Sequence, residues 1–168
     1  MKKTRLPEAA VVVVVALVGL ATAPTEAAAI ETIAVSVGRF NYARPNPETE
    51  IGMELRFAPR KWNLAPMMGL AGTDDGVAFV YGGLRRELRL DSKWSLTPSF
   101  AGSLYDRGGG HDLGGPIEFR SALEISFQTG RRSRVGLAIY HLSNAGIHRR
   151  NPGSNSVVLT LSLPVSRR

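Results

Sequence analysis

A histidine and a serine separated by one residue lie near the C-terminus, in the segment His141-Leu142-Ser143. Side chains two positions apart project from the same face of a β-strand, so this imidazole and this hydroxyl can come within hydrogen-bonding distance. An imidazole that accepts the proton of a serine activates the hydroxyl as a nucleophile. The pair therefore indicates ester hydrolysis, although His-x-Ser alone also fits a headgroup contact at the rim of a barrel.

A third polar side chain can reach this pair from the next run of alternating residues. Asn155 shares odd parity with Val157 and Leu159, and a hairpin across 145–154 sets it beside the end of the run that contains His141. An amide in this place can orient the imidazole but supplies no charge. Asn155 is therefore our candidate for the third member of the site.

The composition excludes several classes of chemistry. The chain has 168 residues, no cysteine and three histidines. Disulfides, Cys-ligated metals and thiol nucleophiles are thus excluded. The histidines lack the HExxH or HxH spacing of a metal site. We expect neither a metal nor another cofactor, and chemistry from hydroxyls, carboxylates and imidazoles alone.

The N-terminus has the pattern of a secretory signal. Lys2, Lys3 and Arg5 precede an uncharged run over 9–23, which is shorter than the roughly 20 residues that a membrane-spanning helix needs. Small residues follow, and we predict a signal peptide over 1–29 and a barrel domain over 30–168. The exported domain keeps a net positive charge, which fits anionic lipid or lipopolysaccharide better than nucleic acid.

After residue 29, apolar and polar residues alternate with period two from end to end, which indicates an all-β protein. Eight runs of about ten residues predict an eight-stranded antiparallel up-and-down transmembrane β-barrel. A bulge is expected at Gly82-Gly83 in the fourth run. The runs cover 33–38, 51–58, 64–72, 77–90, 93–104, 117–127, 134–144 and 157–165.

Alternation by itself does not say which face of the barrel is inside. Large apolar side chains would overfill a narrow lumen, whereas the opposite face is rich in Gly, Ala and Ser. We therefore expect the large apolar residues on the lipid side, including Val77, Phe79 and Tyr81 at the start of the fourth run. The long connections 41–49, 106–115 and 145–154 are predicted outward loops. The charged residues expected to pair in the lumen are Glu54, Arg56, Glu118, Arg120 and Glu124.

The segment His141-Leu142-Ser143-Asn144-Ala145-Gly146, followed by Asn151-Pro152-Gly153, resembles the PagL family of lipid A 3-O-deacylases. The stretch Gly114–Arg120 and the Gly-rich loop before it add to the resemblance. The resemblance implies a barrel in the Gram-negative outer membrane with its His and Ser facing the outer leaflet. It also implies hydrolysis of the ester-linked 3-hydroxyacyl chain at the 3-position of lipid A.

The resemblance assigns a role to each matching residue. Ser143 would be the nucleophile and His141 its base, while Asn155 stands where the family has a glutamate. Asp106 and Asp112 stay open as alternative acids. The resemblance implies an oxyanion site from Asn144, Gly146 and Asn151. We expect Arg149 and Arg150 to hold lipid A phosphates, or to be merely solvated, and no role for His111 and His148.

Two other functions stay open. A non-catalytic outer-membrane barrel, structural or adhesive, would have lost its activity when the acid became Asn155. A soluble periplasmic lipid binder would instead line an internal cavity with its apolar face. For the enzyme, the expected partners are lipopolysaccharide and outer-membrane lipids, with a homodimer left open.

Overall fold

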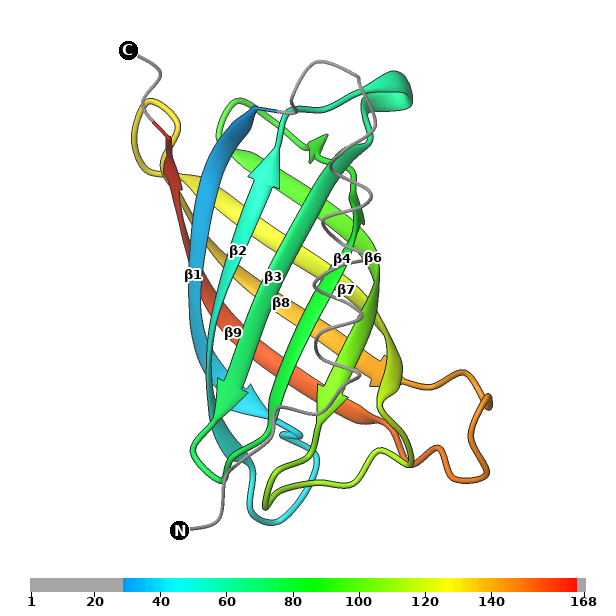
Figure 1. Ribbon diagram of the computed structural model, residues 1–168. Coiled ribbons are helices and arrows are strands. Elements are labelled where there is room, and N and C mark those ends of the chain that lie inside the picture. The colour runs from blue at the N-terminus through cyan, green and yellow to red at the C-terminus, as the bar shows by residue number, and fades with distance from the viewer. Residues whose placement is uncertain (1–28, 166–168) are drawn as a thin grey trace, which may run out of the picture.

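The period-two alternation forms nine antiparallel strands in the computed structural model, which describes residues 29–165 (Figure 1). The signal peptide predicted over 1–29 lies outside the described residues except for its last residue. A short 3-10 helix, η1 (Lys61–Asn63), follows the second strand. The strands are β1 (Ile30–Phe40), β2 (Glu48–Phe57), β3 (Ala65–Thr73), β4 (Ala78–Arg85), β5 (Leu88–Arg89), β6 (Trp94–Asp106), β7 (Ile117–Gln128), β8 (Arg134–Ser143) and β9 (Ser154–Pro164).

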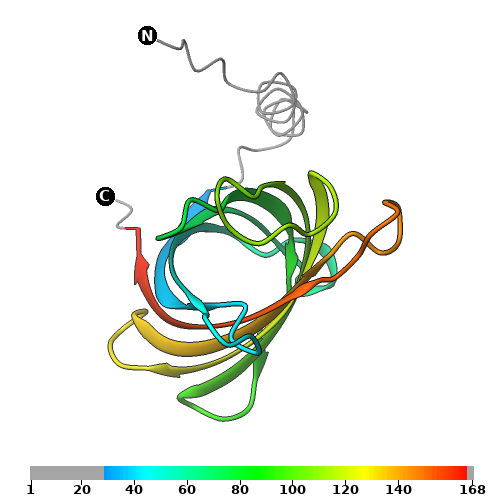
Figure 2. The same ribbon diagram turned by 90° about the horizontal axis from the view of Figure 1, so that it is seen from below.

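Neighbouring strands pair in chain order, and two further pairings close the sheet. β1 pairs with β9, and β4 pairs with β6. The strands consequently encircle one interior, as the view along the barrel shows (Figure 2). The two-residue β5 pairs with the start of β6, beyond the part of β6 that pairs with β4, and does not form a ninth wall strand. This confirms the predicted eight-stranded antiparallel up-and-down barrel.

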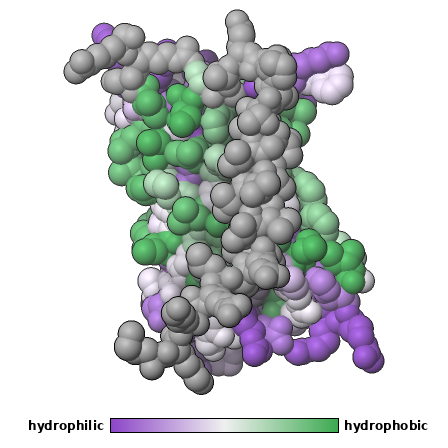
Figure 3. All heavy atoms as spheres, viewed as in Figure 1, coloured by the Kyte–Doolittle hydropathy of each residue, from purple (hydrophilic) through white to green (hydrophobic). Residues whose placement is uncertain are grey.

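The outer wall of the barrel is apolar. On the face seen in Figure 3, hydrophobic residues gather across the middle and hydrophilic residues lie toward both ends, and exposed large hydrophobic side chains continue around the other strands in a band. Such a band is what a lipid-facing barrel wall requires. Among residues 29–165, no helix is long and apolar enough to cross a membrane. Exposed residues of the band include Val35, Val37, Ile51, Leu70, Phe100, Leu123, Ile125, Val135, Leu137, Ile139, Leu159 and Leu161.

The interior holds the charged side chains, as predicted. Arg56 donates from Nε to Glu54 Oε1 over 2.7 Å and from Nη2 to Glu124 Oε2 over 2.6 Å. All three are buried. Ser162 accepts a further bond of 2.8 Å from the same guanidinium. Charge pairing thus confirms the prediction for Glu54, Arg56 and Glu124. The predicted pairing of Glu118 and Arg120 is wrong: both Glu118 carboxylate oxygens are buried without a hydrogen-bond partner, and the Arg120 guanidinium lies over the rings of Tyr81 and Tyr140.

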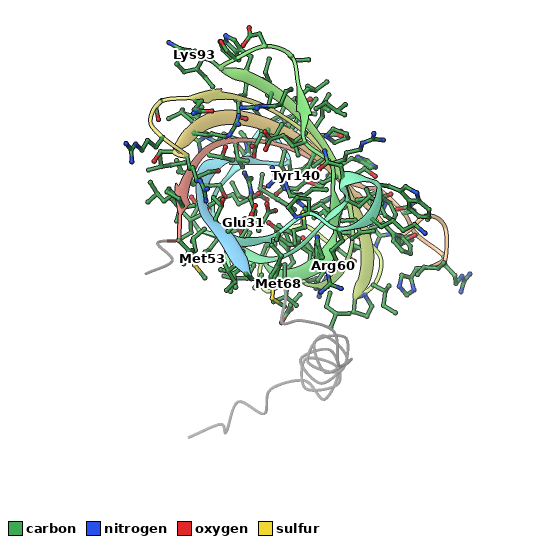
Figure 4. The ribbon with its side chains drawn as sticks, turned by 90° about the horizontal axis from the view of Figure 1, so that it is seen from above. Glu31, Met53, Arg60, Met68, Lys93 and Tyr140 are labelled. Carbon is green, nitrogen blue, oxygen red and sulfur yellow. The ribbon has the colours of Figure 1, made fainter. Side chains whose placement is uncertain are left out.

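An aromatic core fills the half of the lumen near the longer loops, and here the sequence prediction was wrong. Val77, just before β4, and Phe79 and Tyr81 of β4 point inward, not toward lipid, and are buried with Phe40 and Tyr105. Tyr140 lies among the side chains that fill the interior (Figure 4). In β4 the outward residues are also apolar, so alternation could not distinguish the two faces.

The predicted bulge at Gly82-Gly83 is absent from the described strands. Met68 pairs with Gly82 and Met67 with Gly83 without a shift of register. The strand ends instead at Arg85. Arg85 pairs with Ser99 of β6. The next residue along β6 is Pro98, which has no N–H to donate to the ladder. The irregularity therefore lies three residues later than expected.

The connections divide between the two ends of the barrel. Residues 41–47, 74–77, 107–116 and 144–153 lie together at the lower end in Figure 1, which we call the loop end. The connections after β2, β4 and β7 lie at the opposite end, and the two longest uninterrupted connections, 107–116 and 144–153, are both at the loop end. This division matches the predicted long and short connections, and it brings loops that are distant in sequence together beside the end of β8.

Candidate active site

His141 and Asn155 meet across two paired strands on the outer wall. They are directly opposite each other in the β8–β9 ladder. The imidazole Nδ1 lies 2.9 Å from Oδ1 of Asn155. An amide oxygen only accepts hydrogen bonds, so Nδ1 carries the proton. This tautomer leaves Nε2 unprotonated, and Nε2 is the nitrogen that can act as a base.

Ser143 is the last residue of β8, two positions beyond His141 and on the same face. Its neighbour across β7 is Phe119, while His141 pairs with Ser121. Ser143 is half-buried and His141 is exposed. The ladder thus puts a hydroxyl and an imidazole on one face of the wall, where the apolar band meets the loops.

The loop after β8 is organised by Asn144, which is completely buried. Its Nδ2 donates to the carbonyls of Leu113 and Arg150 over 3.0 and 2.8 Å, and its Oδ1 accepts from Gly146 N over 3.0 Å. The backbone N–H of Asn144 donates to Asn151 Oδ1 over 3.0 Å. Both backbone N–H groups predicted for the oxyanion site are therefore engaged within the loop. Asn151 uses its oxygen here, so its amide nitrogen is the end that can donate to a substrate.

Neither aspartate that stayed open as an acid lies against His141. Asp112 accepts from Gly114 N over 2.9 Å and from Arg150 Nη1 over 3.1 Å. The bond from Gly114 is the main reason why the pKa of Asp112 lies below its ordinary value. Asp106 accepts from the backbone of Gly108. Both carboxylates therefore serve the loop that contains them, and Asn155 is the residue in contact with the imidazole.

The two predicted phosphate ligands differ in their surroundings. Arg150 is paired with Asp112, and its backbone carbonyl also holds Asn144. Arg149 is exposed at the loop end. Within residues 29–165, no three imidazole or carboxylate groups gather as they would around a metal ion.

A groove that sequence reasoning missed runs along the wall beside His141. It has a volume of about 330 Å³. It forms where Ser121, opposite His141, interrupts the larger residues of β7. This small residue between Phe119 and Leu123 was the signal that could have indicated it. Outward residues that line the groove are Tyr42, Ser121, Leu123, Ile139, His141 and Asn155.

An apolar outer wall and a polar site on that wall together define the class of outer-membrane β-barrels. A family model described as "Lipid A 3-O-deacylase (PagL)" matches residues 47–164, well over half of the chain. The chain therefore belongs to the PagL family of lipid A 3-O-deacylases.

Solved structures share the fold. The outer membrane enzyme PagL aligns with a TM-score of 0.66 at 18% identity, covering 80% of this chain and 99% of that one. Neisserial surface protein A aligns at 0.60 with 9% identity, covering 83% and 100%. A de novo designed transmembrane β-barrel aligns at 0.55 with 9% identity, covering 82% and 98%. No curated protein sequence matches the chain significantly.

These comparisons carry two conclusions. At such low identity the structural likeness shows the barrel fold alone. Membership of the family makes the chain a hydrolase of the lipid A deacylase class and, with the barrel, supports an outer-membrane location. The roles of individual residues rest on the geometry above.

Proposed function

We propose that this protein hydrolyses the ester bond that holds the 3-hydroxyacyl chain at the 3-position of lipid A. The observation that carries the proposal is the 2.9 Å contact from Asn155 Oδ1 to His141 Nδ1, on the apolar outer wall of a barrel of this family. An ester embedded in the outer leaflet can reach a site on that wall without leaving the lipid phase.

Acylation would proceed by proton transfer through His141. Nε2 takes the proton of Ser143 as Oγ attacks the ester carbonyl. The bond from the acyl carbon to the sugar oxygen then breaks, and His141 returns the proton to that oxygen. Water, deprotonated by His141, attacks the acyl-enzyme and releases the 3-hydroxy fatty acid, which regenerates Ser143. None of these proton transfers or bond changes requires a metal or other cofactor.

Asn155 would complete the site only in part. Its oxygen fixes the tautomer and orientation of His141, but the amide carries no charge to stabilise the imidazolium that forms during acylation. We therefore expect slower turnover than a glutamate would allow. The same observation favours a second candidate, a non-catalytic outer-membrane barrel whose site has decayed at Asn155.

The surrounding residues would bind the rest of the substrate. The Asn151 amide nitrogen would donate to the developing oxyanion, assisted by the backbone from Asn144 to Gly146 if its internal bonds loosen on binding. Arg149 would hold a phosphate of lipid A by paired hydrogen bonds, and Arg150 would contribute less because Asp112 already neutralises it. The acyl chain would lie along Leu123 and Ile139 in the groove.

The proposal also implies how the chain is exported and how the barrel is oriented in the membrane. Residues 1–29 would act as a signal peptide, cleaved after Ala29, and residues 30–168 would form the barrel domain. The loop end would face outward, because lipopolysaccharide occupies the outer leaflet. A homodimer stays a prediction, which sedimentation in detergent would test.

The proposal is tested by incubating refolded residues 30–168 in detergent with lipopolysaccharide and reading lipid A by mass spectrometry. We expect the loss of one 3-hydroxyacyl mass, abolished in Ser143→Ala. If only Asn155→Glu cleaves lipid A, the chain is a decayed enzyme. If neither protein cleaves it, the non-catalytic barrel is correct. The soluble lipid binder is disfavoured by the small void around Arg56, about 30 Å³, and it predicts a domain that stays dispersed without detergent.

A further inference from the structure

The loop over 107–116, which contains the histidine His111 that was expected to have no role, packs directly on the loop over 144–153. Leu113 is buried between them and its carbonyl accepts from Asn144 Nδ2. A Cβ at Gly114 would collide with the carbonyl oxygen of Arg150, and one at Gly115 would collide with the ring of His148. The two loops therefore form one packed unit at the loop end of the barrel.

Within this unit, His111 of the first loop contacts the backbone of Gly153 in the second. Its Nε2 lies 3.3 Å from the carbonyl oxygen of Gly153. A carbonyl oxygen only accepts, so Nε2 of His111 carries the proton and donates. Burial, and then the nearby charge of Arg44, lower the pKa of His111. The ring is therefore neutral at neutral pH, with its hydrogen directed at Gly153.

Gly153 in turn lies against the ring of His141. Its φ of +64° is in the left-handed region, which favours glycine. A Cβ at this position would lie 2.9 Å from Cε1 and 3.3 Å from Nε2 of His141. The backbone that His111 holds is consequently the backbone that borders the basic nitrogen. Asn155 holds the same ring at Nδ1.

The imidazole is thus contacted at two places, by the Asn155 oxygen at Nδ1 and by the Gly153 backbone beside Cε1 and Nε2. The bond to Asn155 is a neutral one, and neutral hydrogen bonds are weaker than those to a carboxylate. A ring held only at Nδ1 can pivot about that bond, which moves Nε2 away from the serine. The packing of Gly153 prevents the pivot, and it matters more in this chain because the third member is an amide.

We propose that His111 is a positioning residue, which fixes Gly153 and through it the orientation of the His141 ring toward Ser143. The inference rests on the proposed function for its kinetic consequence, but the ring orientation is a property of the folded protein. Of the side chains in the loop over 107–116, it gives a supporting role to His111 alone.

The test compares His111→Phe, which keeps a ring and removes the donor, with His111→Gln, whose amide can still donate to the carbonyl. Arg107→Ala, an exposed change in the same loop, is the control. In detergent-refolded protein, we expect His111→Phe to lower kcat for lipopolysaccharide deacylation about 10- to 100-fold with little change in KM. His111→Gln should recover most of that loss, and Arg107→Ala should match the wild type.

A second readout separates this inference from the proposed function. The ¹H–¹⁵N signals of the His141 ring should shift in His111→Phe and stay near their wild-type positions in His111→Gln and Arg107→Ala. Unmoved signals together with wild-type kcat in His111→Phe would overturn the inference. If the wild type leaves lipid A intact, the proposed function fails and the ring signals alone decide. Should His111→Phe fail to refold, His111→Ala removes the same donor.

Discussion

The lumen and the outer wall each hold a polar cluster, and the two are built in opposite ways. In the lumen, Arg56 bonds to two carboxylates over 2.7 and 2.6 Å, and all three groups are buried. On the wall, His141 is exposed and its partner is the neutral Asn155. The lumen cluster consists of paired charges, whereas His141 has one side-chain hydrogen bond, to an uncharged partner.

The difference separates what holds the barrel together from what can do chemistry. A buried ion pair costs desolvation, so its worth lies in leaving no charge unpaired. The wall site has no buried ion pair to break, because His141 and Asn155 are exposed on the outer wall. We therefore expect changes in the lumen to affect stability and changes on the wall to affect activity, with little crossover.

Ser143→Ala gives the largest expected effect on the wall side of this comparison. Removing the nucleophile should reduce kcat for lipid A deacylation by about 10⁴-fold or more, because no acyl-enzyme can form. The midpoint of urea unfolding in lipid vesicles should stay at the wild-type value. A large drop in that midpoint would mean that Ser143 supports the fold and would break the division.

Arg56→Met gives the converse effect in the lumen. The change leaves Glu54 and Glu124 buried without their shared cation, which should cost about 3–5 kcal/mol of the free energy of unfolding. Urea titration in vesicles measures the loss. Arg89→Met, an exposed change at the end of the barrel away from the loop end, is the control. Activity per folded molecule should be unchanged, and a stability equal to that of the wild type would contradict the account of the lumen.

Asn155→Glu sharpens the comparison by adding charge to the wall site. A carboxylate would stabilise the imidazolium, so kcat should rise about 10- to 100-fold. Asn155→Gln has the same side-chain length without charge and should show no such gain. Mass spectrometry of lipid A over a time course gives both rates. A glutamine variant as fast as the glutamate variant would show that reach, not charge, limits the native site.

Acid should loosen the packed loops over 107–116 and 144–153 in two separate steps. Burial holds the pKa of His111 below its ordinary value of 6.5, so the folded state resists protonation. Its contribution to stability is complete above 6.5 and is lost as the pH falls through the lower folded value. The pKa of Asp112 is also lowered, from 3.8, so its contribution persists until still lower pH.

Hydrogen exchange of residues 107–116, corrected for the intrinsic effect of pH, measures this order. Protection should decline first as the pH falls below 6.5, the ordinary pKa of a histidine such as His111. It should decline again below pH 3.8, the ordinary pKa of Asp112. The first step should disappear in His111→Gln, which has no titratable group. A first step that persists in that variant would assign it to another residue.

The strands and their pairing could be predicted from the alternation of polar and apolar residues. The direction of some side chains and the contacts between loops could not, because alternation does not determine them. The contact between His141 and Asn155 was predictable, because parity and one hairpin determine which residues face each other. The inward direction of Phe79 and Tyr81 was not, because Ala78 and Val80 on the other face are apolar as well. The contact of His111 with Gly153 joins two irregular loops, and no period in the sequence relates them.

The smallest expected effect distinguishes the two arginines at the edge of the site. Arg149 is exposed, whereas Arg150 is already neutralised by Asp112. Arg149→Ala should therefore raise KM for lipopolysaccharide about 3- to 10-fold, in line with the loss of one charge-assisted contact at a solvated position. Arg150→Ala should change KM less, although it frees a carboxylate. Lipid A stripped of its phosphates is the control, since both variants should then behave as the wild type. An equal effect of Arg149→Ala on this substrate would mean that the side chain acts through the loop and not through phosphate.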